Sequence, residues 1–322
     1  MLEATNATTG NIPIPFIMKT HPIPAFLLTL VLACSATHRM RAEEKSIDQL
    51  TAAADKGDAD AQFRLGQAYI RGIGVKKNLT TALEFIQRAA NQGHPEAIGG
   101  VGYFHANGFG VKQDLTVAAD WFRKGAEKGG AKAQLNYAQA LLNGRGVPVD
   151  EAEGMKWIDK AIAQDLDQAY FAKGEFHYHG THGIKQDFAK AREFIQKAAD
   201  SDHAAAQNML GAIYQEGLGV TRDLEKAEFW FRKSAEQGDP KGMSNLGQIL
   251  GPDGPDASKH VEALKWLLLA RRANESQAKN VLNLILRTRP PAVVAEAQKQ
   301  MVEFKPRPSL GDQRKPGLPP EK

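Results

Sequence analysis

The sequence has little of what a covalent, metal or catalytic site usually needs. Among its 322 residues Cys34 is the single cysteine, which excludes an intramolecular disulfide and a cysteine metal cluster. The chain has no HExxH motif and no serine, histidine and aspartate set with the spacing of a known family. We therefore expect no catalytic residue, no cofactor site and no metal site.

A charge excess of one sign is also missing. The formal net charge is +4, and residues of both signs are interspersed along the chain. Nucleic-acid-binding domains usually carry a basic stripe with aromatic residues between the charges, and no such stripe occurs here. The sequence therefore predicts no nucleic-acid partner.

No apolar run is long enough to cross a bilayer, which takes ~20 residues. The run 25–33 is shorter, follows Met18-Lys19-Thr20-His21 and ends in small residues, as a bacterial secretory signal does. We expect residues 18–36 to be a signal peptide and the mature protein to be periplasmic or secreted. Residues 1–17 then become a mis-assigned leader before a true start at Met18. The alternative is a disordered leader on a cytosolic protein.

Cys34 has two alternative fates. Val31-Leu32-Ala33-Cys34 resembles a lipobox, in which the cysteine becomes the lipidated first residue of a lipoprotein. A lipid chain would anchor the protein to a membrane, because each buried methylene contributes about 0.8 kcal/mol. Cleavage nearby by an ordinary signal peptidase would instead leave a soluble protein, and both alternatives remain open.

Glycine is abundant, and it recurs with a fixed period. Gly72, Gly108, Gly144, Gly180 and Gly217 are spaced by 36, 36, 36 and 37 residues, and each has a second glycine two or three residues later. A phosphate-binding loop is normally built once, needs a preceding strand or a GK[ST] ending, and would not recur in this way. A fixed period indicates a repeat array instead.

Three further positions share the period. At the first position, a large aromatic residue lies three residues after a small one. At the second, a residue suited to N-capping lies four residues after the second loop glycine. At the third, residues that tolerate left-handed backbone indicate another turn. The aromatic residues are Phe85, Trp121, Trp157, Phe194, Trp230 and Trp266; the N-caps are Asn78, Asp114, Asp150, Asp187 and Asp223; the turn residues are Gly57, Gly93, Gly129, Asp165, Asp202, Gly238 and Asn274. We interpret the aromatic residues as core, with a sugar-stacking platform as the alternative.

Each unit is thus predicted to be a helix, a glycine turn, a capped second helix and a second turn. In the first unit the helices are expected over 59–71 and 79–91. The repeats cover 46–274, beginning with a half unit at 46–56. Helices over 276–287 and 292–304 form a C-terminal cap at 275–304, because the last apolar face needs a cover. The proline- and charge-rich segment 305–322 is expected to be disordered.

The fifth unit carries a recognisable consensus. It resembles the Sel1-like repeats, relatives of the tetratricopeptide repeat, through Ala206, Leu210, Gly211, Tyr214, Gly217, Gly219, Val220, Asp223, Ala227 and Trp230. Some units depart from it: the third has Tyr137-Ala138 for Leu-Gly, the fourth has Lys173 at the leucine, and the sixth replaces the glycine turn with residues 251–255. The resemblance implies an all-α, right-handed α-solenoid of about six helix-turn-helix repeats, used as an adaptor or scaffold and without shared catalytic residues.

One histidine cluster suggests a zinc site. Glu175, His177, His179 and His182 lie within eight residues, and imidazoles are common zinc ligands. His177 has the phase of Tyr69 and Tyr214, however, so we expect it to pack inside the repeat. Two remaining histidines are too few for a tight site, and we predict no metal.

The first helix of each unit should present one face to a partner in the concave groove. Aromatic rings among amides suit peptide recognition, because rings anchor and amides pair with backbone groups. The predicted groove residues are Phe63, Gln67, Tyr103, Gln139, Glu175, Tyr178, Asn208 and Gln248, with Ile70, Leu135, Leu142 and Phe171 on the same face. For Phe63, Leu135 and Phe171, packing against neighbouring helices is an equal alternative.

The leading hypothesis is an exported, non-enzymatic scaffold that binds a protein or peptide of the cell envelope. One alternative is an inhibitory regulator of a membrane sensor. The other is an enzyme acting on envelope polymers, with Glu175 and His179 as acid and base.

Overall fold

The computed structural model describes residues 47–251, 257–276, 278, 281–282, 285–286 and 289–307. By its contacts the chain divides into residues 1–49 and 50–322, and the helix pairs described here belong to the second part. The predicted leader, the signal peptide, Cys34 and the segment 308–322 lie outside the described residues. The same is true of 252–256 in the irregular sixth turn.

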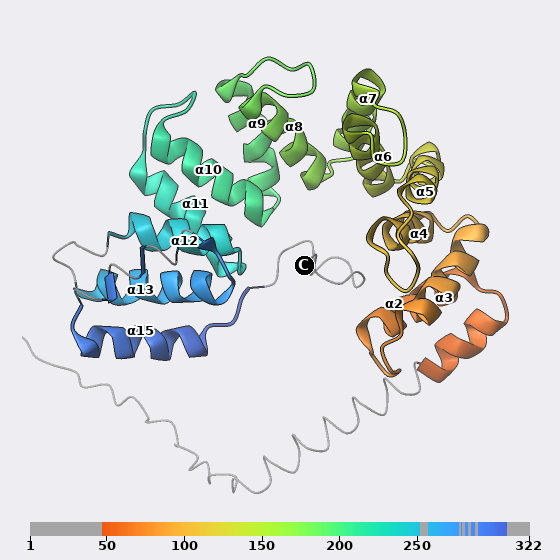
Figure 1. The fold of residues 1–322 in the computed structure, drawn as a ribbon, viewed down its shortest axis with the longest axis horizontal. Helices are drawn as coiled ribbons and strands as arrows, with labels where there is room; N and C mark the ends of the chain where they lie inside the picture. The colour runs from red at the N-terminus through yellow and green to blue at the C-terminus, as the bar shows by residue number, and fades with distance from the viewer. Residues whose placement is uncertain are drawn as a thin grey trace, which may run out of the picture. The chain divides into compact units, whose positions relative to one another are not determined.

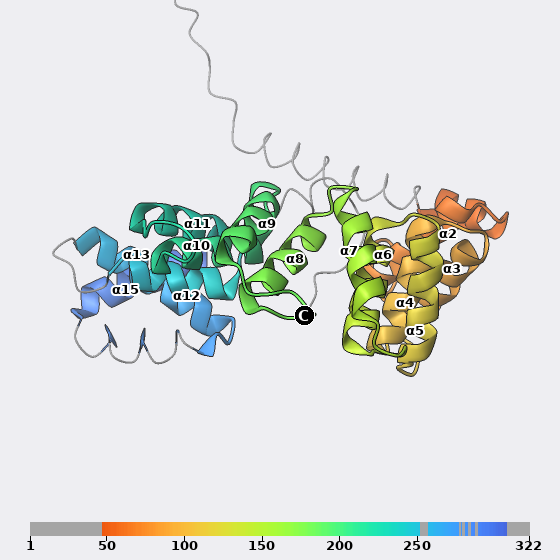
Figure 2. The same ribbon diagram turned by 90° about the horizontal axis from the view of Figure 1, so that it is seen from above.

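The described residues form helices, with no strand among them. Residues 47–55 are helical, and six helix pairs follow in chain order (Figures 1 and 2). The pairs are α2 (Ala59–Arg71) with α3 (Leu79–Asn91), α4 (Pro95–Asn107) with α5 (Leu115–Glu127), α6 (Ala131–Asn143) with α7 (Glu151–Ile162), α8 (Asp167–His179) with α9 (Phe188–Asp200), α10 (Ala204–Glu216) with α11 (Leu224–Glu236), and α12 (Pro240–Ile249) with α13 (Ala257–Arg272); α15 (Pro291–Glu303) packs on α13. The predicted all-α solenoid and the bounds of its first pair are confirmed.

The predicted caps begin the second helix of each pair from α3 to α11. Asp114 illustrates the geometry: its Oδ1 accepts the backbone N–H groups of Thr116 and Val117, both at 3.0 Å. Asn78 also accepts from two backbone N–H groups, and Asp150, Asp187 and Asp223 each accept from one. Each cap satisfies amide groups that have no partner within the helix, so capping accounts for the recurring polar residue at this phase.

The turns need left-handed backbone, as their composition predicts. The seven residues assigned to the turn between repeats all have positive φ: Gly57, Gly93, Gly129, Asp165, Asp202, Gly238 and Asn274. The glycines that follow the first helices are also left-handed, from Gly72 at φ 72° to Gly217 at φ 72°. The glycine pairs therefore turn the chain between two helices.

The second glycine of the loop has a further role in stacking. A side chain on Gly110 would lie 2.6 Å from the backbone of Leu79, and one on Gly146 would overlap the backbone carbonyl of Leu115. Each of these glycines thus lets a loop touch the start of the second helix in the preceding repeat. The junction between consecutive repeats depends on this close approach of backbones.

The core is built from small residues on one helix and large ones on the other. Trp157, Trp230 and Trp266 are buried, and so are the small residues three positions before all six periodic aromatics. Gly102 allows the Phe122 ring so close that an added Cβ would lie 2.6 Å from it. The core prediction is confirmed for these three tryptophans, whereas Trp121, Phe85 and Phe194 are half-buried at the helix surface.

Within the described residues no helix is both long and apolar enough to pass through a membrane.

Candidate partner-binding face

The first helices of neighbouring repeats share one side of the array. Besides packing on its own second helix, α4 contacts α6, and α10 contacts α12. The side chains that point along this line form what we call the first-helix face, defined by the eight predicted groove residues. They come from all six first helices, α2 to α12.

All eight residues of the first-helix face are accessible. Gln139 and Gln248 are exposed, and the other six are half-buried: Phe63, Gln67, Tyr103, Glu175, Tyr178 and Asn208. Three of the neighbouring apolar candidates are not. Ile70, Leu135 and Leu142 are 4%, 6% and 4% exposed, so the assignment of Ile70 and Leu142 to an open groove was wrong, and for Leu135 the alternative of packing is confirmed. They pack between helices, as when Leu142 sits against Gly154 of α7.

Two phenylalanine rings, Phe63 of this face and Phe171 beside it, are held in place from the next repeat. Phe63 lies 4.7 Å from His94 and Phe171 lies 4.8 Å from His203, measured between ring centroids. Both histidines are N-caps, because their Nδ1 atoms accept the backbone N–H of Ala97 and of Ala206. The ring positions are therefore fixed by two helix starts, which lowers the entropy lost when a partner contacts them.

The two tyrosines are held within their own repeats. Tyr103 meets Phe109 edge-on with ring centroids 5.7 Å apart, and Tyr178 meets Phe188 in the same way at 5.3 Å. Tyr178 also lies 4.9 Å from His179. These side chains are half-buried, so each leaves part of a rigid ring to solvent, as interface anchors do.

Two side-chain amides of the face, those of Asn208 and Gln248, make hydrogen bonds within the array. Asn208 Oδ1 accepts a hydrogen bond from Asn245 Nδ2 at 2.8 Å, which ties α10 to α12. Gln248 Nε2 donates to the carbonyl and hydroxyl oxygens of Ser244 at 3.2 Å each. The side-chain oxygen of Gln248 and the side-chain NH₂ group of Asn208 make no hydrogen bond with another described residue.

Glu175 is the acidic residue among the eight. Burial raises the pKa of its carboxyl group, while His179 and Lys241 act in the opposite direction. Its carboxylate has no hydrogen bond or ion pair with another described residue. A nearby cation stabilises a half-buried carboxylate that has no such contact, so a lysine or arginine of a partner fits here better than an acidic group.

The histidine cluster does not converge on one point. His177 stacks parallel on Phe194, with ring centroids 5.6 Å apart, and burial lowers its pKa. His182 Nδ1 faces Glu151 at 3.3 Å, while His179 is exposed beside Tyr178. In the described part of the chain no three histidine, cysteine or acidic residues are grouped to hold a metal ion.

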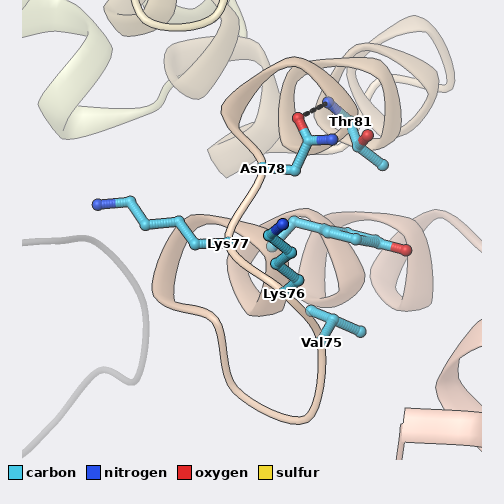
Figure 3. Close-up of a pocket in the computed structure, with 6 residues that line it drawn as sticks. Val75, Lys76, Lys77, Asn78 and Thr81 are labelled. Atoms are coloured by element: carbon cyan, nitrogen blue, oxygen red, sulfur yellow. Dashed lines mark hydrogen bonds between the residues drawn. The ribbon is translucent and has the colours of Figure 1, made fainter.

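A hollow of about 480 Å³ lies away from this face, at the first glycine turn. It is lined by Tyr69, Val75, Lys76, Lys77, Asn78 and Thr81 (Figure 3). In this view Lys77 extends away from Val75 and Thr81, and Asn78 is engaged in capping α3. The hollow is a consequence of the turn, and its charged groups do not converge.

A buried glutamine network escaped the sequence interpretation. Gln62, Gln134 and Gln207 donate to a backbone carbonyl of the preceding helix and accept from a glutamine thirty residues later, at Gln92, Gln164 and Gln237. These pairs occur in the first, third and fifth repeats. The sequence does contain glutamines at the same position of these three repeats. Because the second, fourth and sixth repeats have other residues there, the pattern does not recur in every unit and was not recognised.

The Sel1 repeat family model matches six consecutive segments, residues 59–94, 95–130, 131–166, 168–203, 204–239 and 240–275. A stretch of 77 residues is 38% identical to HRD3B of Arabidopsis thaliana, named as a component of an ERAD-associated E3 ubiquitin-protein ligase. That stretch covers 24% of this chain and 12% of HRD3B.

Two solved structures are similar over most of this chain. A protective antigen of uropathogenic Escherichia coli strains is 32% identical, with a TM-score of 0.62 over 80% of this chain and 56% of the antigen. A Sel1 repeat protein from Oxalobacter formigenes is 26% identical, also with a TM-score of 0.62, over 74% of this chain and 95% of its own.

Proposed function

Because this chain belongs to the Sel1 repeat family, whose members bind protein partners, we propose that it is a non-enzymatic scaffold that captures a protein or peptide on the first-helix face. The observation that carries the proposal is a set of half-buried rings on the first helices, each held by a ring contact with an adjacent element. Phe63, Phe171 and Tyr178 combine rigidity with an accessible edge, and such rings dominate binding energy in interfaces. The free amide groups and Glu175 add polar selectivity.

The double change Tyr103→Ala with Tyr178→Ala tests this face. Both rings lie at the helix surface, so the variant should keep its circular dichroism spectrum. Partner affinity should fall by about 1 kcal/mol or more for each anchor. The measurement is capture of partners from envelope extract, followed by titration of the captured protein against both forms.

A matched control is Phe229→Ala, which removes a ring that is 51% exposed on a second helix, α11. This variant should bind as the parent does. If the double tyrosine variant is folded and still captures the same protein at parental strength, the first-helix face is not the binding site. A regulator of a membrane sensor would use the same face, so the identity of the captured protein separates the two functions.

The proposed location is the cell envelope, reached through the signal peptide at 18–36. The support is the sequence pattern of that segment. Alkaline phosphatase fused after residue 46 should be active in bacteria, and deletion of Lys19–Ala33 should abolish that activity. An active fusion without the segment would contradict export. Cys34→Ser distinguishes the two exported forms, because only a lipoprotein would lose membrane association.

A further inference from the structure

The segment that follows the last helix folds back over the array. Phe304 packs edge-on against Trp266 of α13, with ring centroids 5.1 Å apart. The backbone N–H of Arg307 then donates to the carbonyl oxygen of Glu236 at 2.7 Å. Pro306 lies against Gly238, where an added Cβ would come within 3.2 Å of the proline ring. Residues 304–307 thus pass from the sixth repeat to the turn between the fifth and sixth.

The Arg307 side chain continues this path to the preceding turn, where it meets Asp202. Its Nη1 and Nη2 atoms donate to the two carboxylate oxygens of Asp202 at 3.1 and 2.9 Å. Asp202 is 7% exposed, and its Oδ1 also accepts from the amides of Gln207 and Gln237 at 3.0 and 3.2 Å. A bidentate pair to a buried, pre-positioned carboxylate is selective for the planar guanidinium over a lysine ammonium.

The residue type at 202 is itself informative. Its equivalents in four other turns are Gly57, Gly93, Gly129 and Gly238, and all have positive φ. Asp202 adopts φ 68°, a conformation that is strained for a residue with a side chain and costs glycine nothing. Asp165 and Asn274 hold two further turns of this phase at positive φ, so the backbone tolerates a side chain here. Asp202 differs from Asp165 in its burial, because its carboxylate is 7% exposed and bonded to Arg307 whereas Asp165 is exposed.

We propose that the turn around Asp202 is an arginine-binding site for an extended, proline-flanked segment, filled in this chain by Lys305–Arg307, and that this contact clasps repeats four to six together. In a solenoid each repeat otherwise contacts only its neighbours. The clasp joins the turn after α9, the turn after α11 and helix α13. It makes the C-terminal half of the first-helix face a more rigid unit than the N-terminal half.

The test isolates the contact between Arg307 and Asp202. Asp202→Gly relieves the backbone strain of this turn, but it also removes the acceptor of Gln207 and Gln237, so its effect is measured both in the parent and in the Arg307→Ala background. The clasp predicts that Asp202→Gly lowers the Tm by about 2–4 °C more in the parent than in that background. Asp165→Gly is the matched control, because Asp165 is exposed at φ 55° and pairs with the Tyr170 hydroxyl at 3.1 Å; it should shift the Tm equally in both backgrounds. Equal shifts for Asp202→Gly in the two backgrounds overturn the proposal.

Hydrogen exchange supplies a second measurement on the full chain. Arg307→Ala and Arg307→Lys should both speed amide exchange in α9 to α13 and leave α2 to α5 unchanged. A lysine that protects as well as the arginine contradicts bidentate recognition. Acceleration spread evenly over all repeats, or none, contradicts a clasp confined to repeats four to six. Arg123→Ala, which breaks an exposed pair with Asp120 on α5, should alter neither region.

Discussion

At the scale of single residues, Trp157 shows how a repeat position becomes core. The side chain is 9% exposed, Tyr137 meets its ring edge-on at 5.9 Å, and the Lys160 ammonium lies 3.5 Å from the ring centroid. Its indole Nε1 is buried without a partner among the described residues. The ring is therefore held by packing and by the Lys160 cation, without a hydrogen bond.

We predict that Trp157→Ala lowers the free energy of unfolding by about 3–5 kcal/mol, the range for emptying a large aromatic site. Urea denaturation measures the loss. In a variant whose other tryptophans are phenylalanine, the fluorescence of Trp157 should resist iodide. Trp121→Ala should cost less, because Trp121 is half-buried. Free quenching of Trp157, or parental stability of its alanine variant, would place the ring on the surface.

His177 gives the fold a pH dependence at the same scale. Burial, and then the charge of Lys190, lower its pKa from 6.5. The unfolded chain therefore binds a proton at this histidine more readily than the folded chain does. The contribution of neutral His177 to the free energy of unfolding is complete above pH 6.5, and it is lost as pH falls from 6.5 through the pKa of the folded state. His177→Tyr, the residue type of the equivalent Tyr69 and Tyr214, should flatten this part of the stability curve. Urea melts between pH 7.5 and 5 provide the comparison; parallel curves for parent and variant would refute this assignment.

At the scale of helices, capping decides where each second helix begins. We predict that Asp114→Ala destabilises the chain by about 1 kcal/mol, because two amides at the start of α5 lose their acceptor. Asp114→Asn should cost a few tenths of that, since Asn78 caps α3 with the same atoms. Thermal denaturation of the two variants measures these losses. Equal losses of stability would show that the charge of Asp114, rather than its hydrogen bonds, stabilises the start of the helix.

At the scale of the whole repeat array, the junctions between repeats depend on the second loop glycines. Gly146→Ala combines a strained φ of 80° with an overlap on Leu115 of the preceding repeat. Gly129→Ala carries a similar φ of 88° with nothing within 4 Å of the new methyl group. We predict a loss of about 1–2 kcal/mol for Gly129→Ala from strain alone and a larger loss for Gly146→Ala. Calorimetry on both variants separates the two effects, and equal losses would mean that the junction yields easily.

The sequence by itself determined the helix caps, the left-handed turns and the helix pairs, which are local or periodic features. Asn78 and Asp114 could be assigned as caps, and Gly129 and Asp202 as left-handed residues, because those roles depend on a few neighbouring backbone groups. Their recurrence reinforced each assignment, and it also fixed the helix pairs. The eight residues of the first-helix face followed from helical geometry applied to the same pattern.

Only the tertiary structure decided which of the residues on that side of the first helices are buried between helices. Ile70, Leu135 and Leu142 share the helical face of the candidates yet are buried, because accessibility depends on how closely the next helix approaches. The contact of Arg307 with Asp202 was likewise invisible, since 105 residues separate the partners and no period relates them. Composition predicted a disordered segment from residue 305. In the structure Arg307 instead pairs with the buried carboxylate of Asp202, and Pro306 packs against Gly238, so Lys305–Arg307 lie against the repeats. Contacts of this kind depend on where the chain returns in space, which no local pattern encodes.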